Sequence, residues 1–205
     1  MTLDIRGSLK NTRINTSHYV VIDELLSNAI DSYLIRKDSE DDAPSLEIEF
    51  VIELFKKDLD GQNYDLKISC TDNGAGLGDE QMKAFITKDT SYKDDLAISG
   101  IGQCKGSGRI QFLHYFSHLK IESAFLDGDI YKLRYLHIDS NAKEIDENSF
   151  KNSESPSQDL STTITLDVIK PDVYEKLFLG QNLYSEFSSE ALKNHVLVAS
   201  LQRLV

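Results

Sequence analysis

The pattern of apolar and polar positions predicts a long helix near the start of the chain, followed by a pair of strands. Residues 18–37 contain no glycine or proline, and their apolar side chains recur at helical spacing. Residues 45–55 alternate between apolar and polar side chains, and a second alternating run ends at Thr71-Asp72. Such alternation is typical of strands with one buried face. We expect the two strands to form a hairpin.

The rest of the chain predicts shorter elements. These are a helix at 79–87, a long loop at 88–108, a helix at 109–118, strands at 119–126, 130–138 and 162–169, a short helix from Pro171 and an amphipathic helix at 185–204. Residues 139–160 are polar without periodicity and are expected to form an exposed insertion. Helices and antiparallel strands in this order predict an α+β fold.

Composition narrows the class of protein. With 205 residues, of which 40% are apolar, the chain is long enough for one domain with a substantial core. A formal net charge of -12 argues against direct binding of nucleic acid by this segment. No apolar run approaches the length of a membrane span, no secretory signal is visible, and two cysteines are too few for a disulfide framework. We therefore expect a cytoplasmic location without membrane contact.

A first polar motif lies within the long predicted helix. Glu24, Asn28 and Asp31 are four and three residues apart, so their side chains project from one side of the helix. A carboxylate and a carboxamide one turn apart can hold a hydrated magnesium ion and orient a water molecule. Taken alone, the motif fits a solvated helix face at least as well.

A second motif, Asp72-Asn-Gly74-Ala-Gly76-Leu77, follows the second strand. Two glycines separated by one residue let the backbone approach a flat ligand, because no Cβ intervenes. The carboxylate of Asp72 can accept a hydrogen bond from an exocyclic amine. An ordinary turn at the end of a strand is the alternative interpretation.

A third motif is rich in glycine and runs into the helix predicted at 109–118. Four glycines precede that helix within nine residues, so backbone N–H groups and the positive end of the helix dipole face an anion. Charged and hydroxyl side chains there suit phosphate. The residues concerned are Gly100, Gly102, Lys105, Gly106, Ser107, Gly108 and Arg109. The segment lacks the Gly-Lys-Ser/Thr of a Walker A loop.

A zinc site is a weaker candidate. His114 and His118 are four residues apart within the helix predicted at 109–118, which is the spacing of paired zinc ligands. Position 115 is tyrosine rather than glutamate, and no third ligand is evident. We expect no metal site at these histidines.

The order of the motifs resembles the GHKL (Bergerat-fold) ATPase superfamily. E-x-x-x-N-A-x-D on a helix, D-x-G-x-G after a strand, a glycine-rich lid and a threonine in a later strand occur in sequence between residues 18 and 169. The residues of the first two motifs are most similar to those of the heat-shock chaperone, MORC and MutL branches. The resemblance implies a two-layer α/β sandwich, with a mixed, mostly antiparallel sheet and helices on one face.

The resemblance also implies roles for individual residues. Glu24 matches the general base that activates water, Asn28 the magnesium ligand and Asp72 the residue that binds the adenine amine. Thr162 is expected beside Asp72, but the family's glycine is Ser161 here, so the choice between Thr162 and Thr163 stays open. Asp31 is expected to support the packing of the helix against the lid or to bind a water near adenine. The other motif residues named above are expected to surround ATP.

At the level of the whole chain, the resemblance implies an ATP-binding domain over residues 1–180, with a lid at 78–108 and the polar insertion at 139–160. Residues 181–205 would form a C-terminal helix that starts a following domain. The expected function is binding and hydrolysis of Mg-ATP to drive lid closure, with homodimerisation on ATP binding and a further domain or client protein as partner. Two alternatives remain: a nucleotide-gated interaction module with little hydrolysis, and a protein kinase of the same fold.

Overall fold

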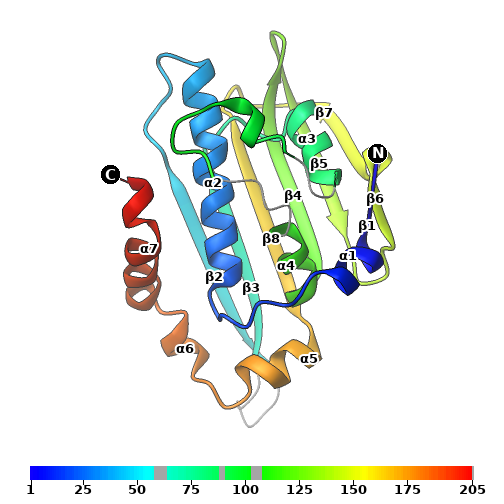
Figure 1. Cartoon of the computed structure of the whole chain (residues 1–205), viewed down its shortest axis with the longest axis vertical. Coiled ribbons are helices and arrows are strands. Elements are labelled where there is room, and N and C mark those ends of the chain that lie inside the picture. Colours follow the sequence, from blue (N-terminus) through cyan, green and yellow to red (C-terminus); the bar gives the residue numbers. More distant parts are fainter. Residues whose placement is uncertain (58–63, 88–90, 103–107, 205) are drawn as a thin grey trace.

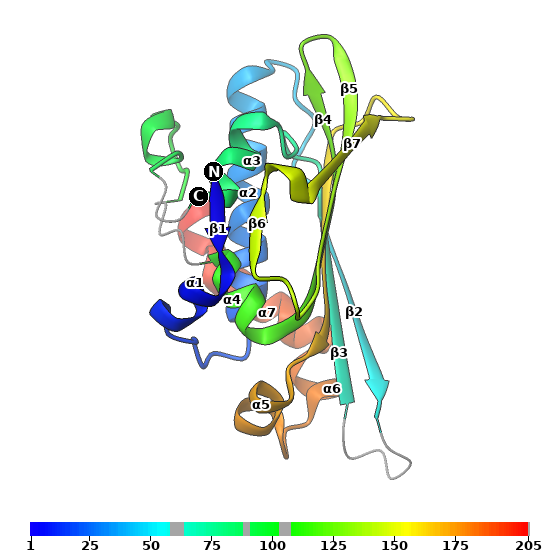
Figure 2. The same ribbon diagram turned by 90° about the vertical axis from the view of Figure 1, so that its right-hand side faces the viewer.

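The fold is a six-stranded antiparallel sheet with helices on one face (Figures 1 and 2). It comes from a computed structural model that describes residues 1–57, 64–87, 91–102 and 108–204. In spatial order the strands are β2 (Ile48–Lys56), β3 (Tyr64–Asp72), β8 (Ser161–Ile169), β4 (Phe116–Asp127), β5 (Ile130–Ile138) and β7 (Phe150–Glu154). The predicted α+β class is confirmed. The expectation of a mixed sheet is wrong for the described strands, because every pairing between them is antiparallel.

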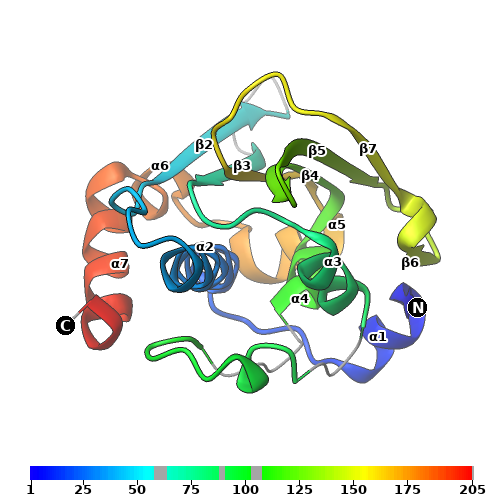
Figure 3. The same ribbon diagram turned by 90° about the horizontal axis from the view of Figure 1, so that it is seen from above.

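The helices form a layer against the sheet, which Figure 3 shows from above. The central helix is α2 (Val20–Ser39), and it lies between α7 (Ser189–Leu204) at the β2 edge and the pair α3 (Asp79–Ile86) and α4 (Gly108–Tyr115). The smaller elements are β1 (Thr2–Asp4), α1 (Ile5–Asn11), η1 (Asp94–Leu96), β6 (Glu144–Asp146), η2 (Glu147–Ser149), α5 (Pro171–Val173), η3 (Tyr174–Phe178) and α6 (Leu183–Glu186). The first strand, β1, pairs with β6 in a separate two-stranded sheet.

The core lies between the helix layer and the sheet. On β3, Leu66, Ile68 and Cys70 are buried, whereas the residues between them are only partly buried. This period of two is what a strand with one buried face produces. Asp72 is the next member of the buried series and ends the strand. The alternation that builds the core therefore also carries a carboxylate to the inner face of the sheet.

Most predicted elements are confirmed within a few residues, but three segments differ. The helix predicted at 109–118 ends at Tyr115, since His118 already belongs to β4. His114 and His118 therefore do not share a helix, and no cluster of three or more potential ligands for a metal occurs in the part of the chain that the structure describes. The helix predicted at 185–204 is two helices, α6 and α7.

The segment 139–160 is not an irregular insertion, because it contains β6, η2 and β7. Strand β7 pairs with β5 at the edge of the main sheet. Its first residue, Phe150, is buried and the other four are exposed, so the strand has no apolar alternation for a sequence pattern to reveal. Within the described ranges, no helix is long and apolar enough to cross a membrane.

Candidate functional site

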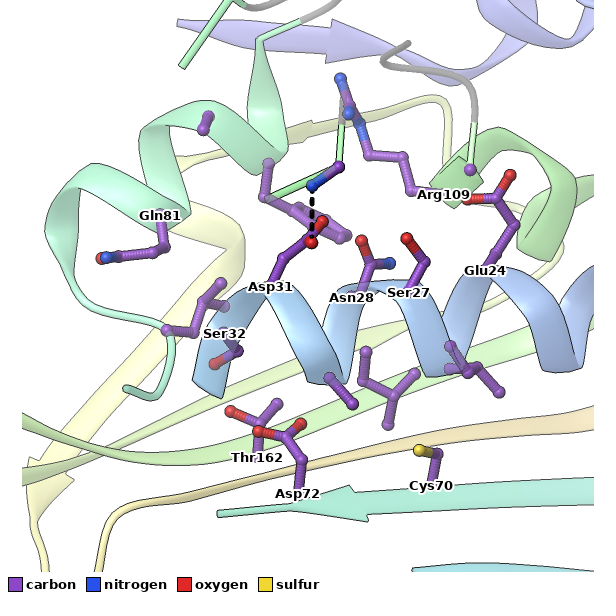
Figure 4. A pocket seen from close by; sticks show the side chains of 18 of the residues that line it. Glu24, Ser27, Asn28, Asp31, Ser32, Cys70, Asp72, Gln81, Arg109 and Thr162 are labelled. Atoms are coloured by element: carbon purple, nitrogen blue, oxygen red, sulfur yellow. Dashed lines mark hydrogen bonds between the residues drawn. The ribbon is translucent and has the colours of Figure 1, made fainter. Parts of the chain in front are cut away.

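A cavity of about 600 Å³ lies at the centre of the fold. Residues of α2, α3, α4, β3, β4 and β8 line it, together with the lid segment, which we define as residues 91–102. The cavity has a polar wall along α2 and a floor at the ends of β3 and β8 (Figure 4). Apolar side chains complete the walls, among them Ala29, Ile35, Phe112, Ile121 and Ile164.

The motif on α2 forms one side of this cavity. Glu24, Asn28 and Asp31 all line it and project from the same face of the helix (Figure 4). Asp31 is 1% exposed. Its carboxylate accepts hydrogen bonds from Lys93 Nζ at 2.7 Å and from the Gly102 amide at 2.9 Å. Of the two roles expected for Asp31, the structure supports packing of the helix against the lid.

The floor of the cavity brings together two side chains that are far apart in the sequence. Asp72 on β3 and Thr162 on β8 are directly opposite each other in the antiparallel register, and they are 7% and 8% exposed. Thr163 turns to the other face of the sheet, where its hydroxyl bonds that of Thr71 at 2.9 Å. The alternation of β8 thus decides the choice that the sequence left open, and Thr162 is the threonine in the pocket.

A short hydrogen-bond network holds the floor in place. Asp72 Oδ1 accepts from the Gly74 amide at 2.9 Å and the carboxylate also accepts from the Ser32 side chain. Ser123 Oγ lies 2.8 Å from Thr162 Oγ1 and accepts from the Leu77 amide at 2.8 Å. These contacts fix the side chains on which a ligand would rest, so the floor is preorganised.

Burial controls the ionisation of this floor. It raises the pKa of Asp72 to about 7, although the hydrogen bonds from Gly74 and Ser32 act in the opposite direction. Burial, and then the charge of Asp72, also raise the pKa of the neighbouring Cys70 thiol to about 12. At neutral pH the floor therefore combines a neutral thiol with a carboxyl group close to its midpoint of titration.

The glycines that follow Asp72 are required by close packing. A Cβ on Gly74 would overlap the side chain of Ser32. Gly76 has a φ of +80°, and a Cβ there would lie 2.5 Å from the carbonyl oxygen of Ala124. Any other residue at position 76 would be strained in its backbone as well as crowded. Gly76 and Leu77 line the cavity.

A buried arginine anchors the chain just beyond these glycines. Arg134, on β5, donates to the Leu77 carbonyl at 2.8 Å and to Asp79 Oδ1 at 2.6 Å, at the start of α3. Its guanidinium group lies over the ring of Phe125, 4.5 Å from the centroid. Sequence reasoning did not select Arg134, because nothing in the β5 pattern distinguishes it from the surface lysine two positions earlier.

The opposite end of the cavity is formed by the start of α4. Gly108 and Arg109 line it, and a Cβ on Gly108 would overlap the carboxylate of Glu24. Arg109 donates to the carbonyl of Thr87 at 2.6 Å and lies over the ring of Phe85.

Only some of the remaining positions of the glycine-rich motif are described by the structure. Of these, Gly102 lines the cavity and its amide donates to Asp31, whereas Gly100 has a φ of +81° and lies near Leu34. Three predicted phosphate contacts, Lys105, Gly106 and Ser107, lie outside the described residues.

The structure adds pocket residues that sequence reasoning missed. Lys93 is the main one, since its ammonium group bonds Asn28 Oδ1 at 3.2 Å in addition to Asp31. Gln81 on α3 donates to the Tyr92 hydroxyl at 3.0 Å, which fixes the lid segment to α3. Ser27 and Ser32 also line the cavity. Lys93 belongs to no motif, and only the folded chain brings it to α2.

No protein-family model matches the sequence, and a comparison with curated proteins finds no match. The function is therefore inferred from the residues of the pocket. A buried hydrogen-bond acceptor at one end, apolar walls in the middle, and oxygen ligands beside a helix N-terminus at the other end suit a ligand with a flat amine-bearing ring and an anionic tail.

Proposed function

We propose that this chain binds Mg-ATP in the central cavity and hydrolyses it, as a member of the GHKL superfamily with a Bergerat fold. The observation that carries the proposal is the convergence of Glu24 and Asn28 on α2 with Asp72 and Thr162 on the sheet. These four residues come from three elements spread over about two-thirds of the sequence. They line one cavity of about 600 Å³, which falls within the range of small-molecule pockets.

At the floor, the ionised carboxylate of Asp72 accepts a hydrogen bond from the exocyclic amine of adenine. The neighbouring hydroxyl of Thr162 completes the polar edge, and the apolar walls enclose the faces of the ring. A purine that presents a carbonyl oxygen at this position would face the carboxylate of Asp72, another acceptor, when that group is ionised. The floor therefore favours adenine over guanine, because unpaired buried acceptors weaken binding strongly.

At the other end, Asn28 Oδ1 supplies an oxygen of the kind that magnesium prefers. The N-terminus of α4 directs backbone N–H groups and a partial positive charge toward the polyphosphate. Glu24 lies against Gly108 at this helix start. Its carboxylate would therefore lie beside a terminal phosphate bound at the N-terminus of α4. It removes a proton from water as the oxygen attacks phosphorus, and the bond to the bridging oxygen breaks to give ADP and phosphate.

Lid closure and dimerisation belong to the same proposal. Closure of residues 78–108 over the nucleotide excludes water from the phosphates and completes the site. Pairing of two copies in the presence of ATP is the expected output, and light scattering with and without nucleotide measures it directly.

The test of hydrolysis is Glu24→Gln, which keeps the shape of a side chain packed tightly against Gly108. We expect ATP binding to persist while phosphate release falls by about 100-fold or more, the usual contribution of a general base. Asp38→Asn is the matched control, because it removes one carboxylate from an exposed position on the same helix. Equal turnover in the wild-type protein and Glu24→Gln would refute the role of Glu24.

Two further outcomes separate the alternatives. ATP binding without turnover in the wild-type protein would support the first alternative, a nucleotide-gated interaction module with little hydrolysis. Transfer of labelled phosphate to protein, rather than its release into solution, would indicate a kinase. Both are read from the same incubation with labelled ATP.

A further inference from the structure

Lys93 lies in the pocket beside Asn28, the residue proposed to bind magnesium. Its ammonium nitrogen lies 3.2 Å from Asn28 Oδ1, the proposed magnesium ligand, and 2.7 Å from Asp31 Oδ2. The Asp31 side chain is 2% exposed and that of Lys93 is 23% exposed, so this is a largely buried contact. It is unlike the ion pairs on the protein surface, such as that between Lys132 and Asp127.

The same contact attaches the lid segment to α2. The Asp31 carboxylate accepts hydrogen bonds from Lys93, near the start of residues 91–102, and from the amide of Gly102, at their end. Tyr92 adds a contact with Gln81 on α3. The described part of the lid is therefore held by hydrogen bonds at both of its ends, and one carboxylate on α2 receives two of them.

The ammonium group of Lys93 and a magnesium ion would compete for Asn28 Oδ1, because both are cations and like charges beside one oxygen repel each other. The wall along α2 also carries a further carboxylate, Glu24, about two helical turns from Asp31. A cation at Asn28 therefore offsets negative charge whether or not a ligand is bound.

We propose that Lys93 is an internal cation that occupies the magnesium position in the nucleotide-free protein, and that the metal of an incoming Mg-nucleotide displaces it. This inference rests on the proposed function. Displacement breaks one of the contacts on Asp31 and releases the start of the lid segment from α2. Arrival of the metal is thereby coupled to movement of the lid. The apparent affinity for magnesium is reduced by the fraction of molecules in which Lys93 occupies Asn28.

The experiment compares Lys93→Met with the wild-type protein. ATP binding is titrated with Mg²⁺ at fixed ATP, and hydrogen exchange of residues 91–102 is followed without nucleotide. We expect the half-saturating Mg²⁺ concentration to fall by roughly fivefold or more, the scale of coupling between ligands of one protein. Exchange of the Gly102 amide should become faster in the variant. Lys93→Arg, which keeps the charge, should restore a Mg²⁺ requirement close to that of the wild-type protein.

Lys83→Met is the matched control, because Lys83 is exposed on α3, outside residues 91–102, and the substitution removes the same charge. It should change neither the Mg²⁺ requirement nor the exchange. An unchanged or higher Mg²⁺ requirement in Lys93→Met, with ATP still bound, would overturn the displacement but not the proposed function. Weaker ATP binding at saturating Mg²⁺ would show instead that Lys93 contacts phosphate. Absence of ATP binding in the wild-type protein would overturn both proposals.

Discussion

The buried carboxyl group of Asp72 should lower the free energy of unfolding of the nucleotide-free protein at neutral and alkaline pH. The carboxyl group is 7% exposed, and burial raises its pKa from 3.8 to about 7. Because the folded protein holds this proton more tightly than the unfolded chain does, the stability contribution of Asp72 is greatest below pH 4. It is lost progressively as the pH rises to about 7 and stays constant above that.

Replacement of Asp72 by asparagine removes the titration and keeps an oxygen that can accept from the Gly74 amide. The interval between 3.8 and about 7 corresponds to about 4 kcal/mol, since one pKa unit is about 1.4 kcal/mol. We therefore expect the free energy of unfolding of Asp72→Asn at pH 8 to exceed that of the wild-type protein by up to about 4 kcal/mol. Near pH 4 the two proteins should be almost equally stable.

Urea denaturation of both proteins at several pH values between 4 and 8 measures this difference, and the remaining titratable groups largely cancel in the comparison. A difference that does not change with pH, or a less stable variant at pH 8, would refute the reasoning. The same variant should bind ATP at least about tenfold more weakly, because its amide donors face the adenine amine. ATP affinity of the wild-type protein should also fall as the pH drops below 7.

Two further variants test how the pocket is held. Gly76→Ala should lower the free energy of unfolding by about 2 kcal/mol or more, because it combines a positive φ with a close contact to Ala124. Gly128→Ala, at a positive φ with nothing within 4 Å of the added Cβ, is the control and should lose only about 1 kcal/mol in the same denaturation experiment. Arg134→Met should lower stability by about 2–4 kcal/mol and speed hydrogen exchange in α3. The buried guanidinium group is lost, and the partly buried carbonyl of Leu77 and the side chain of Asn152 lose their donor. Lys132→Met, which removes the same charge from an exposed ion pair on the same strand, should change stability by less than about 1 kcal/mol; a similar loss in both variants would contradict the anchoring role of Arg134.

Sequence patterns were sufficient to predict the elements in which the apolar pattern repeats within a single helix or strand. The helix α2 and the strands of the two hairpins, β2–β3 and β4–β5, were predicted because apolar side chains recur along each with the period of a helix or a strand. The sequence motifs also selected Glu24 and Asn28 on α2 and Asp72 on β3, which line one cavity because they lie on the inward sides of these elements.

Features that depend on long-range pairing were not predictable in the same way. The choice between Thr162 and Thr163 needed the phase of β8, which Ser161 and the neighbouring threonines do not reveal. Strand β7 was missed because an edge strand with exposed polar side chains has no apolar alternation. Lys93 was missed because its partners lie more than sixty residues earlier in the chain.

The direct pairing of Asp72 with Thr162 limits how the length of the chain can change. A single insertion or deletion within β3 or β8 would shift one strand by a residue, and every side chain beyond it would turn to the opposite face of the sheet. Substitutions on the outer face of these strands leave the pocket floor in place. The tip of the β4–β5 hairpin at Gly128 has open space around it. Added segments or inserted domains can therefore be accommodated at that tip, whereas changes of length next to the floor would remove the binding site as a whole.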